Sequence, residues 1–180
     1  MKVFLSDLHL GDGKERDDFQ FHQEFEDLVR KLSREFKKIE MILLGDIFDL
    51  IRTQKYYEFE GLPHPEVKLK VMEDIVEQHV PFFETLRYFT GKKTRRLRYV
   101  IGNHDFGASL DPRLLEMVRE KFGLILIPES YYRNEPLGSG PSMVTDTTLS
   151  IIPSTRMELR SLTPSGTKLS WKSLISSMRR

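Results

Sequence analysis

Residues 40–49 read Glu-Met-Ile-Leu-Leu-Gly-Asp-Ile-Phe-Asp, an apolar run followed at once by small and acidic residues. The run Glu40–Leu44 is short, continuous and aliphatic, which is typical of a strand buried on both faces. Gly45 lacks a Cβ, so the backbone after the strand can approach another group closely. The stretch therefore predicts a buried strand whose carboxyl end presents the carboxylates of Asp46 and Asp49.

Two other apolar strands end in a similar way. Lys2–Ser6 leads into Asp7-Leu8-His9, and Leu97–Ile101 leads into Gly102-Asn103-His104-Asp105. Asp7 and His9 are two residues apart, so in an extended chain they project to the same side. Because ligands collect at the carboxyl ends of strands in open α/β sheets, we expect the three clusters to meet at one edge.

Helices are expected between these strands, because apolar residues recur there at helical spacing. The other expected elements are a helix capped by Asp17 or Asp18 and running to about Lys38, a helix from Glu66 to Phe89 interrupted at Pro81, a helix over 112–122 and a strand over 124–127. The alternation of strands and helices predicts an α/β layered domain.

The composition excludes several functional classes. The chain has 180 residues with 28 basic against 27 acidic side chains, a balance that argues against a strongly electrostatic nucleic-acid binder. It contains no cysteine, so disulfides, thiolate metal sites and thiol nucleophiles are excluded. Any metal must be held by histidine, carboxylate or amide groups. No transmembrane or signal segment is expected, which predicts a cytoplasmic protein.

Taken together, the Asp-x-His, Gly-Asp-x-x-Asp and Gly-Asn-His-Asp clusters within residues 2–132 resemble the signature of the calcineurin-like metallophosphoesterase family. Phe4–Leu10 and Gly45–Asp49 look most like the UDP-2,3-diacylglucosamine hydrolase branch of that family. The resemblance implies a layered β-sandwich flanked by helices and hydrolysis of a phosphoester or pyrophosphate bond. The implied substrate is a phosphorylated small molecule or a lipid-nucleotide. A nuclease-like phosphodiesterase is an alternative, which the balanced charge disfavours.

The resemblance also implies a role for each residue at the strand ends. Asp7 and His9 would bind one divalent ion, Asp46 would bridge two ions, and Asn103 would bind the second. Two such ions lower the pKa of a shared water and neutralise charge on the reacting oxygens. His104 would contact the scissile phosphate with Asp105 raising its basicity, and Asp49 would lie behind the ligands. This ligand set suits Mn²⁺, or Fe²⁺ or Zn²⁺, better than Ca²⁺.

The loop Arg52–Pro65 follows the Asp46 cluster directly. Arg52 and Lys55 are candidate ligands for a substrate phosphate, and the aromatic side chains of the loop could stack on a base or lipid. An ordinary core or lid role for this loop is an equal alternative.

Later histidines that the family signature requires, including a Gly-His-x-His block, have no counterpart here. Of the five histidines, none follows His104. The other three outside the strand-end clusters, His22, His64 and His79, are interpreted as ordinary surface or boundary residues. Weak or single-metal occupancy is therefore expected. The alternative to an enzyme is a catalytically inert metal-binding fragment or a pseudogene product.

Residues 138–180 differ in composition from residues 1–137, which form the expected metallophosphoesterase domain. They hold sixteen serines and threonines against eight in residues 1–137, and Trp171 is their one aromatic residue. Such a segment builds a core poorly. We expect a loosely packed tail with a short helix near Trp171–Met178, whose deletion would barely change the stability of residues 1–137.

A reading-frame shift after about Leu137 is one hypothesis for this composition. Degenerate codons for residues 143–150, read one base earlier, can encode a Gly-His-x-Tyr-Asp segment similar to that of family members at this place. A natural tail is the alternative. Apolar surface left by a missing part of the fold could be buried by a partner or by formation of a homo-oligomer.

Overall fold

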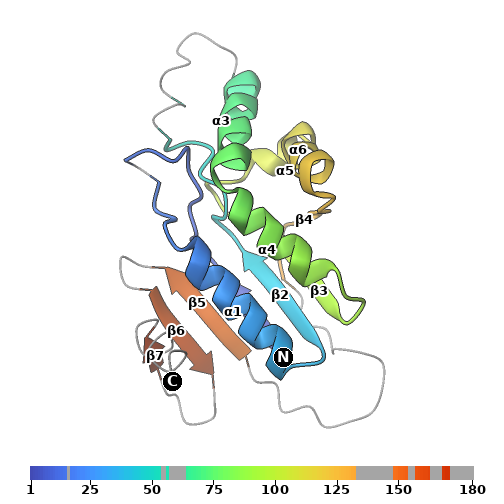
Figure 1. Ribbon diagram of the computed structural model, residues 1–180. Helices are drawn as coiled ribbons and strands as arrows, with labels where there is room; N and C mark the ends of the chain where they lie inside the picture. Colours follow the sequence, from blue (N-terminus) through green and yellow to red (C-terminus); the bar gives the residue numbers. More distant parts are fainter. Residues whose placement is uncertain are drawn as a thin grey trace.

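The computed structural model describes residues 1–15, 17–53, 56 and 64–132, and the backbone of three strands between residues 148 and 170. In chain order the elements are β1 (Lys2–Leu5), α1 (His22–Glu35), β2 (Ile39–Leu44), α3 (His64–Gln78), α4 (Val80–Thr90), β3 (Arg95–Val100), α5 (Gly107–Leu110), α6 (Arg113–Phe122), β4 (Pro128–Glu129), β5 (Thr148–Pro153), β6 (Met157–Leu162) and β7 (Lys168–Ser170). Strands and helices alternate as far as β4, so the prediction of an α/β fold is confirmed (Figure 1).

The seven strands form one sheet in the order β4-β3-β2-β1-β5-β6-β7. The pairings from β4 through β3, β2 and β1 to β5 are all parallel, whereas β5 with β6 and β6 with β7 pair antiparallel. Within the described ranges this is one sheet, and the second sheet of the expected β-sandwich is not seen. Leu5 pairs with Leu43, and Leu43 pairs with Tyr99. The carboxyl ends of β1, β2 and β3 therefore lie at the same edge.

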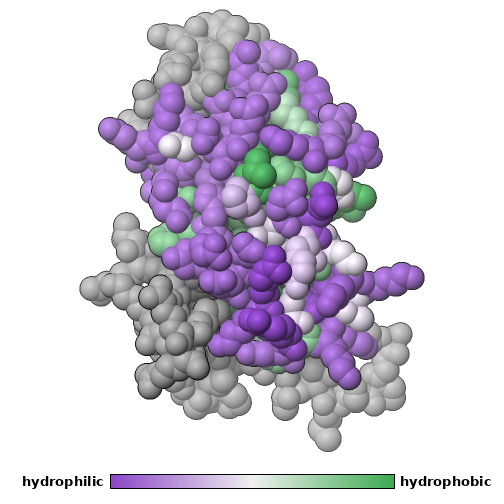
Figure 2. Space-filling view, viewed as in Figure 1, coloured by the Kyte–Doolittle hydropathy of each residue, from purple (hydrophilic) through white to green (hydrophobic). Residues whose placement is uncertain are grey.

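Helices α1 and α4 lie over one face of the sheet (Figure 1). Each helix buries one apolar stripe; the buried residues are Phe25, Leu28, Val29 and Leu32 in α1, and Phe82, Phe83, Leu86 and Phe89 in α4. The rings of Phe25 and Phe82 stack with their centroids 4.8 Å apart. The outward surface over these helices is largely hydrophilic (Figure 2). This amphipathic spacing is what fixes the helices against the strands.

Two boundaries differ from the sequence-based expectation. Helix α1 begins at His22 because Asp17 does not cap it: the Asp17 carboxylate accepts hydrogen bonds from the backbone N–H groups of Gly13 and Phe19 within the preceding loop. The strand expected over 124–127 is also displaced, since the ladder with β3 forms only at Pro128–Glu129. The expected interruption of the second helix is confirmed, because α3 ends one residue before His79 and α4 begins one residue after it.

The expectation of little regular structure after residue 138 is wrong for residues 148–153, 157–162 and 168–170. Strands β5, β6 and β7 lie there, and β5 pairs with β1 along its whole length, from Lys2 opposite Thr148 to Leu5 opposite Ile151. The helix expected near Trp171–Met178 falls outside the described residues. Across the ranges that the structure describes, no helix combines the length and the apolar character needed to cross a membrane.

We predict that Ser150→Pro destabilises the protein by about 3 kcal/mol, because Ser150 lies in a strand paired on both sides and proline cannot donate the ladder hydrogen bond. Urea unfolding followed by circular dichroism measures the change. Ser150→Thr, which keeps the backbone N–H and suits a strand, is the matched control. Equal unfolding midpoints for the two variants would show that β5 contributes nothing to the sheet.

Candidate metal centre

The loops after β1 and β2 continue side by side beyond the ends of the strands. The N–H of Asp7 donates to the carbonyl of Gly45 at 3.1 Å, and the N–H of His9 donates to the carbonyl of Asp46 at 3.0 Å. Leu10 then forms an isolated parallel bridge with Phe48. Backbone pairing, and not side-chain contact alone, therefore fixes where Asp7, His9 and Asp46 lie.

Three residues at this edge have backbone conformations that L-amino acids rarely adopt. The φ angles of Asp7, His9 and Asp46 are 52°, 50° and 53°, and they are the only positive values for non-glycine residues among the described positions. A non-glycine residue in this region costs about 1–3 kcal/mol and persists where the surroundings impose it. All three are residues that the sequence predicts as metal ligands.

The side chains of these residues converge. One nitrogen of His9 and one carboxylate oxygen from each of Asp7 and Asp46 lie within 4.8 Å of one another, and all three residues are half-buried. Two carboxylates and an imidazole form a donor set that transition metals accept. The residues present thus fit a divalent cation, and they are the three residues expected to bind the first ion of the pair.

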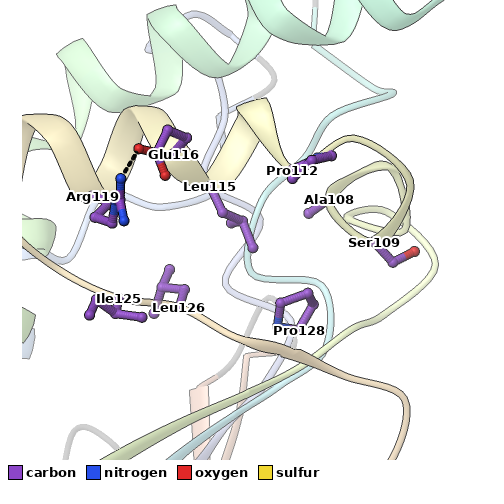
Figure 3. A pocket seen from close by; sticks show the side chains of 9 residues that line it. All are labelled: Ala108, Ser109, Pro112, Leu115, Glu116, Arg119, Ile125, Leu126 and Pro128. Atoms are coloured by element: carbon purple, nitrogen blue, oxygen red, sulfur yellow. Dashed lines mark hydrogen bonds and ion pairs between the residues drawn. The ribbon is translucent and has the colours of Figure 1, made fainter.

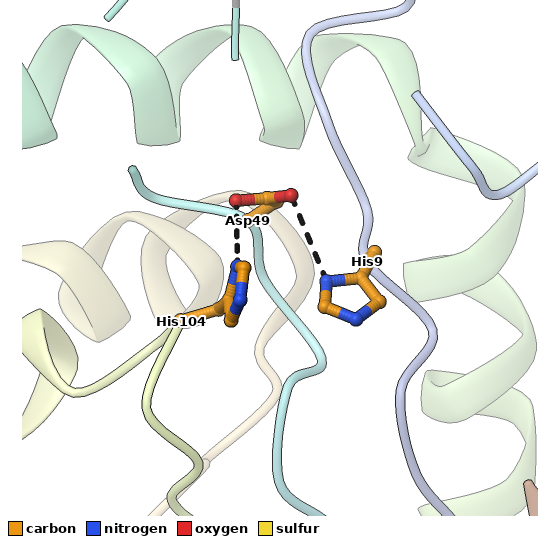
Figure 4. Close-up of side chains that lie close together, drawn as sticks. All are labelled: His9, Asp49 and His104. Atoms are coloured by element: carbon orange, nitrogen blue, oxygen red, sulfur yellow. Dashed lines mark hydrogen bonds and ion pairs between the residues drawn. The ribbon is translucent and has the colours of Figure 1, made fainter. Parts of the chain in front are cut away.

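Asp49 lies between the imidazoles of His9 and His104 (Figure 4). Its Oδ1 accepts a hydrogen bond from Nδ1 of His104 at 3.1 Å, and its Oδ2 lies 3.6 Å from Nδ1 of His9. The two imidazole rings meet edge to face with centroids 4.7 Å apart. That Asp49 lies behind the ligands stays a prediction, because Asp49, His9 and His104 are themselves close enough together to share an ion. The spacing of Asp49 in the sequence did not reveal that it contacts two histidines.

The side chains of His9 and Asp49 each shift the pKa of the other in the direction that favours its charged form. Burial raises the pKa of Asp49, but the nearby His9 and His104 outweigh burial, so the pKa is lower than usual. The Asp49 carboxylate is in turn the main reason why the pKa of His9 is raised, against the opposing effect of burial. Within the described residues, Nδ1 of His9 and Oδ2 of Asp49 are buried and have no hydrogen-bond partner. These two atoms face one another at 3.6 Å, just beyond hydrogen-bond distance.

Asp105 has a different role from the one expected. The family resemblance implies that it raises the basicity of His104, but its carboxylate accepts hydrogen bonds from the backbone N–H groups of Ile47 at 3.0 Å and Gly102 at 2.6 Å. It is fully buried, and burial is the largest effect raising its pKa. Asp105 therefore ties the loop after β2 to the loop after β3, while Asp49 orients His104.

Gly102 lets those two loops touch. A Cβ at this position would overlap the backbone nitrogen and Oδ1 of Asp46. Oδ1 of Asp46 also accepts a hydrogen bond from the N–H of His104 at 3.0 Å. The glycine therefore allows the third strand-end cluster to approach the candidate ligand Asp46.

The other predicted site residues are exposed beside the cluster or lie outside the described residues. Asn103 is exposed on the turn beside His104, and its role as a ligand stays a prediction. Arg52 is half-exposed, and its Nε lies 3.9 Å from Oδ2 of Asp49, so it stands beside the cluster. Lys55 and the side chain of His64 fall outside what the structure describes.

The interpretation of His79 as a surface or boundary residue is wrong, because its side chain is only 2% exposed.

A separate cavity of about 290 Å³ lies between α5, α6 and the segment that leads into β4 (Figure 3). Its lining includes Leu115, Ile125 and Leu126, together with the ion pair between Glu116 and Arg119. None of the candidate metal ligands lines it, so it is distinct from the strand-end cluster.

Comparisons with protein-family models, with curated proteins and with solved structures found no match to this chain.

We predict that Gly102→Ala weakens Mn²⁺ binding by about tenfold or more, since a shift of Asp46 or of the loop after β3 must accompany the new Cβ. Isothermal titration calorimetry measures the affinity. Gly91→Ala is the matched control, because a Cβ there meets its neighbours at ordinary distances of 3.5 and 3.6 Å. If both variants bind Mn²⁺ as tightly as the original protein does, the close approach at Gly102 has no bearing on the site.

Proposed function

We propose that this chain is a metal-dependent phosphoesterase that holds a divalent cation on Asp7, His9 and Asp46. One observation carries the proposal: the three convergent donor residues are also the three non-glycine residues with strained left-handed backbone among the described positions. A turn with only a structural role would be more stable with glycine at such positions. The presence of aspartate and histidine there supports a role for their side chains.

The cation we propose is Mn²⁺, with Fe²⁺ or Zn²⁺ as the other candidates. Mixed imidazole and carboxylate ligands suit these metals, whereas Ca²⁺ takes oxygen ligands. When bound, such an ion would supply Lewis-acid charge to a phosphoryl oxygen and lower the pKa of a coordinated water. The family resemblance of the three clusters, which share this ligand chemistry, supports a phosphoester or pyrophosphate as the substrate.

His104 is the residue we propose for proton transfer. Its Nδ1 donates to Asp49, which fixes the ring orientation and leaves Nε2 for a substrate. A protonated Nε2 would donate a hydrogen bond to a phosphoryl oxygen or a proton to the leaving oxygen. Arg52, on the exposed side of Asp49, would neutralise charge on a bound phosphate.

A metal-binding protein without catalytic activity is the second candidate. It is favoured by the absence of any histidine after His104, which leaves a second ion with only Asp46 and Asn103 of the expected ligands. The two candidates differ in catalysis and agree on metal binding, so each needs its own test.

For metal binding, we predict that Asp46→Asn reduces Mn²⁺ affinity more than any other single substitution, because Asp46 contributes both to the ion cluster and to the turn that carries His104. Calorimetric titration of each variant with Mn²⁺ tests this. Asp27→Asn removes an exposed carboxylate of α1 far along the chain and is the control. An equal loss of affinity in the control would mean that Mn²⁺ binds by diffuse charge.

For catalysis, we predict slow hydrolysis of an aryl phosphodiester with Mn²⁺ present and none with a chelator. His104→Asn should lower kcat by about 10²-fold or more while the protein still binds Mn²⁺, because it removes proton transfer and not a proposed ligand. Release of the aryl product, measured by absorbance, gives the rate. Metal binding with no turnover in the original protein would favour the second candidate.

A further inference from the structure

A second histidine cluster lies at the break between α3 and α4, apart from the candidate ligands. Nε2 of His79 lies 2.8 Å from Oδ2 of Asp17 and 3.0 Å from the carbonyl oxygen of Gly11. Nδ1 of the same ring lies 2.9 Å from Nε2 of His22, the first residue of α1. The side chains of His79 and Asp17 are 2% and 1% exposed. The three side chains thus form a chain from a buried carboxylate to the half-buried His22.

The geometry limits how many protons this chain can hold. Nε2 of His79 faces two acceptors, so it carries a hydrogen. The contact between His79 and His22 needs one hydrogen between two nitrogens, supplied by either ring. The pair can therefore accept one proton and keep every hydrogen bond, because Asp17 faces the resulting charge. A second proton would place two N–H groups against each other and break the contact.

The cluster holds the loop that follows the candidate ligand His9. Asp17 accepts hydrogen bonds from the backbone N–H of Gly13 at 2.9 Å and of Phe19 at 3.0 Å, while His79 binds the carbonyl of Gly11. The ring of Phe19 packs edge to face against both imidazoles, with centroids 5.1 Å from His22 and 5.9 Å from His79. The loop is thereby attached to the helices at several points.

We propose that Asp17, His79 and His22 form a proton-dependent clasp, which holds the loop after His9 against α1 and α4 at neutral pH. The clasp loosens on acidification, when a second proton on the histidine pair sets two N–H groups against each other and His22 leaves the contact. The clasp itself does not require a metal. Its effect on the candidate metal centre rests on the proposed function, because Gly11 is two residues from His9.

The surroundings of His22 explain why acidification, and not a rise in pH, loosens the clasp. The pKa of His22 is lower than its ordinary value of 6.5, first because of burial and second because of His79, while Asp17 in the loop and Glu24 in α1 act in the opposite sense. His22 also lies at the amino end of α1, where the helix dipole disfavours a positive charge. A histidine with a lowered pKa binds protons more weakly in the folded state than in the unfolded state. Its contribution to stability is present above pH 6.5 and is lost as the pH falls through the lowered value.

Asp17 stays ionised over that range. Burial raises its pKa, but the hydrogen bond from His79 and the backbone N–H groups of Phe19 and Gly13 lower it further, and the net result is a pKa below the ordinary 3.8. Loosening as the pH falls below 6.5 would therefore come from protonation of His22, and loss of the Asp17 charge would act only at much lower pH.

Amide hydrogen exchange on the metal-free full chain tests the clasp. The amides of Gly13 and Phe19 report directly, because both donate to Asp17. We expect their protection factors to fall about tenfold between about pH 7.5 and about pH 5.5 in the original protein, and to stay nearly constant in His22→Gln, whose amide can donate to His79 but cannot titrate. Gln23→Ala, at the exposed neighbouring position, is the matched control and should respond like the original protein.

An equal fall in His22→Gln, or no fall in the original protein, would overturn the proposal. Long-range ¹H–¹⁵N spectra of the unmodified protein give a second readout that needs no variant. They should show a hydrogen on Nε2 of His79 at neutral pH, and a hydrogen on Nδ1 alone would contradict the clasp.

The link to the metal centre has a separate measurement. Between about pH 7.5 and about pH 5.5, Mn²⁺ affinity should fall less in His22→Gln than in the original protein, because the loop after His9 stays attached. Equal falls in the two proteins would exclude the link. If neither protein binds Mn²⁺ at any pH, the proposed function fails, while the exchange data still decide whether the clasp exists.

Discussion

Parallel backbone pairing that runs on from β1 and β2 into their loops is the constraint on which the candidate metal centre depends. In the register that pairs Leu5 with Leu43, the backbone of Asp7 also bonds to Gly45 and that of His9 to Asp46. The backbone alone therefore brings the donor residues together, without an ion. Holding three non-glycine residues at positive φ requires surroundings that permit no easier conformation. The hydrogen bonds between the two loops supply that restraint, and the buried sheet beneath them makes it rigid.

Buried carboxylates then join the loops to one another. Asp105 binds the backbone of the loops after β2 and β3, Asp49 orients the imidazole of His104, and Asp17 holds the loop after β1 in place. Each is almost completely buried, and each accepts at least one hydrogen bond from a loop or a histidine. Asp7 and Asp46 are only half-buried, and one oxygen of each lies within 4.8 Å of a nitrogen of His9. Asp49 lies within the same distance of His9 and His104, so this buried carboxylate both supports the loops and belongs to a second group of possible ligands.

The sequence predicts the parallel core and the donors better than it predicts their supporting contacts. Aliphatic runs before Asp7, Asp46 and His104 locate the strand ends because a buried strand must be apolar on both faces. The partner of His104 could not be predicted in the same way: Asp105 is its sequence neighbour, but the turn directs that carboxylate to Ile47 and Gly102. Burial of His79 depends on the packing of α4 against the loop, which no local pattern reports. The strands after residue 147 were missed because their serine and threonine content suggested a polar tail, whereas threonine also suits strands.

The central claim is that Asp7, His9 and Asp46 form a site for a divalent cation. A crystal structure of the Mn²⁺-soaked protein, with anomalous differences measured near the manganese absorption edge, tests it most directly. The account predicts one strong anomalous peak at bonding distance, about 2.0–2.3 Å, from an oxygen of Asp7, an oxygen of Asp46 and a nitrogen of His9. A peak at other residues, or no peak at a Mn²⁺ concentration that saturates comparable sites, would contradict it.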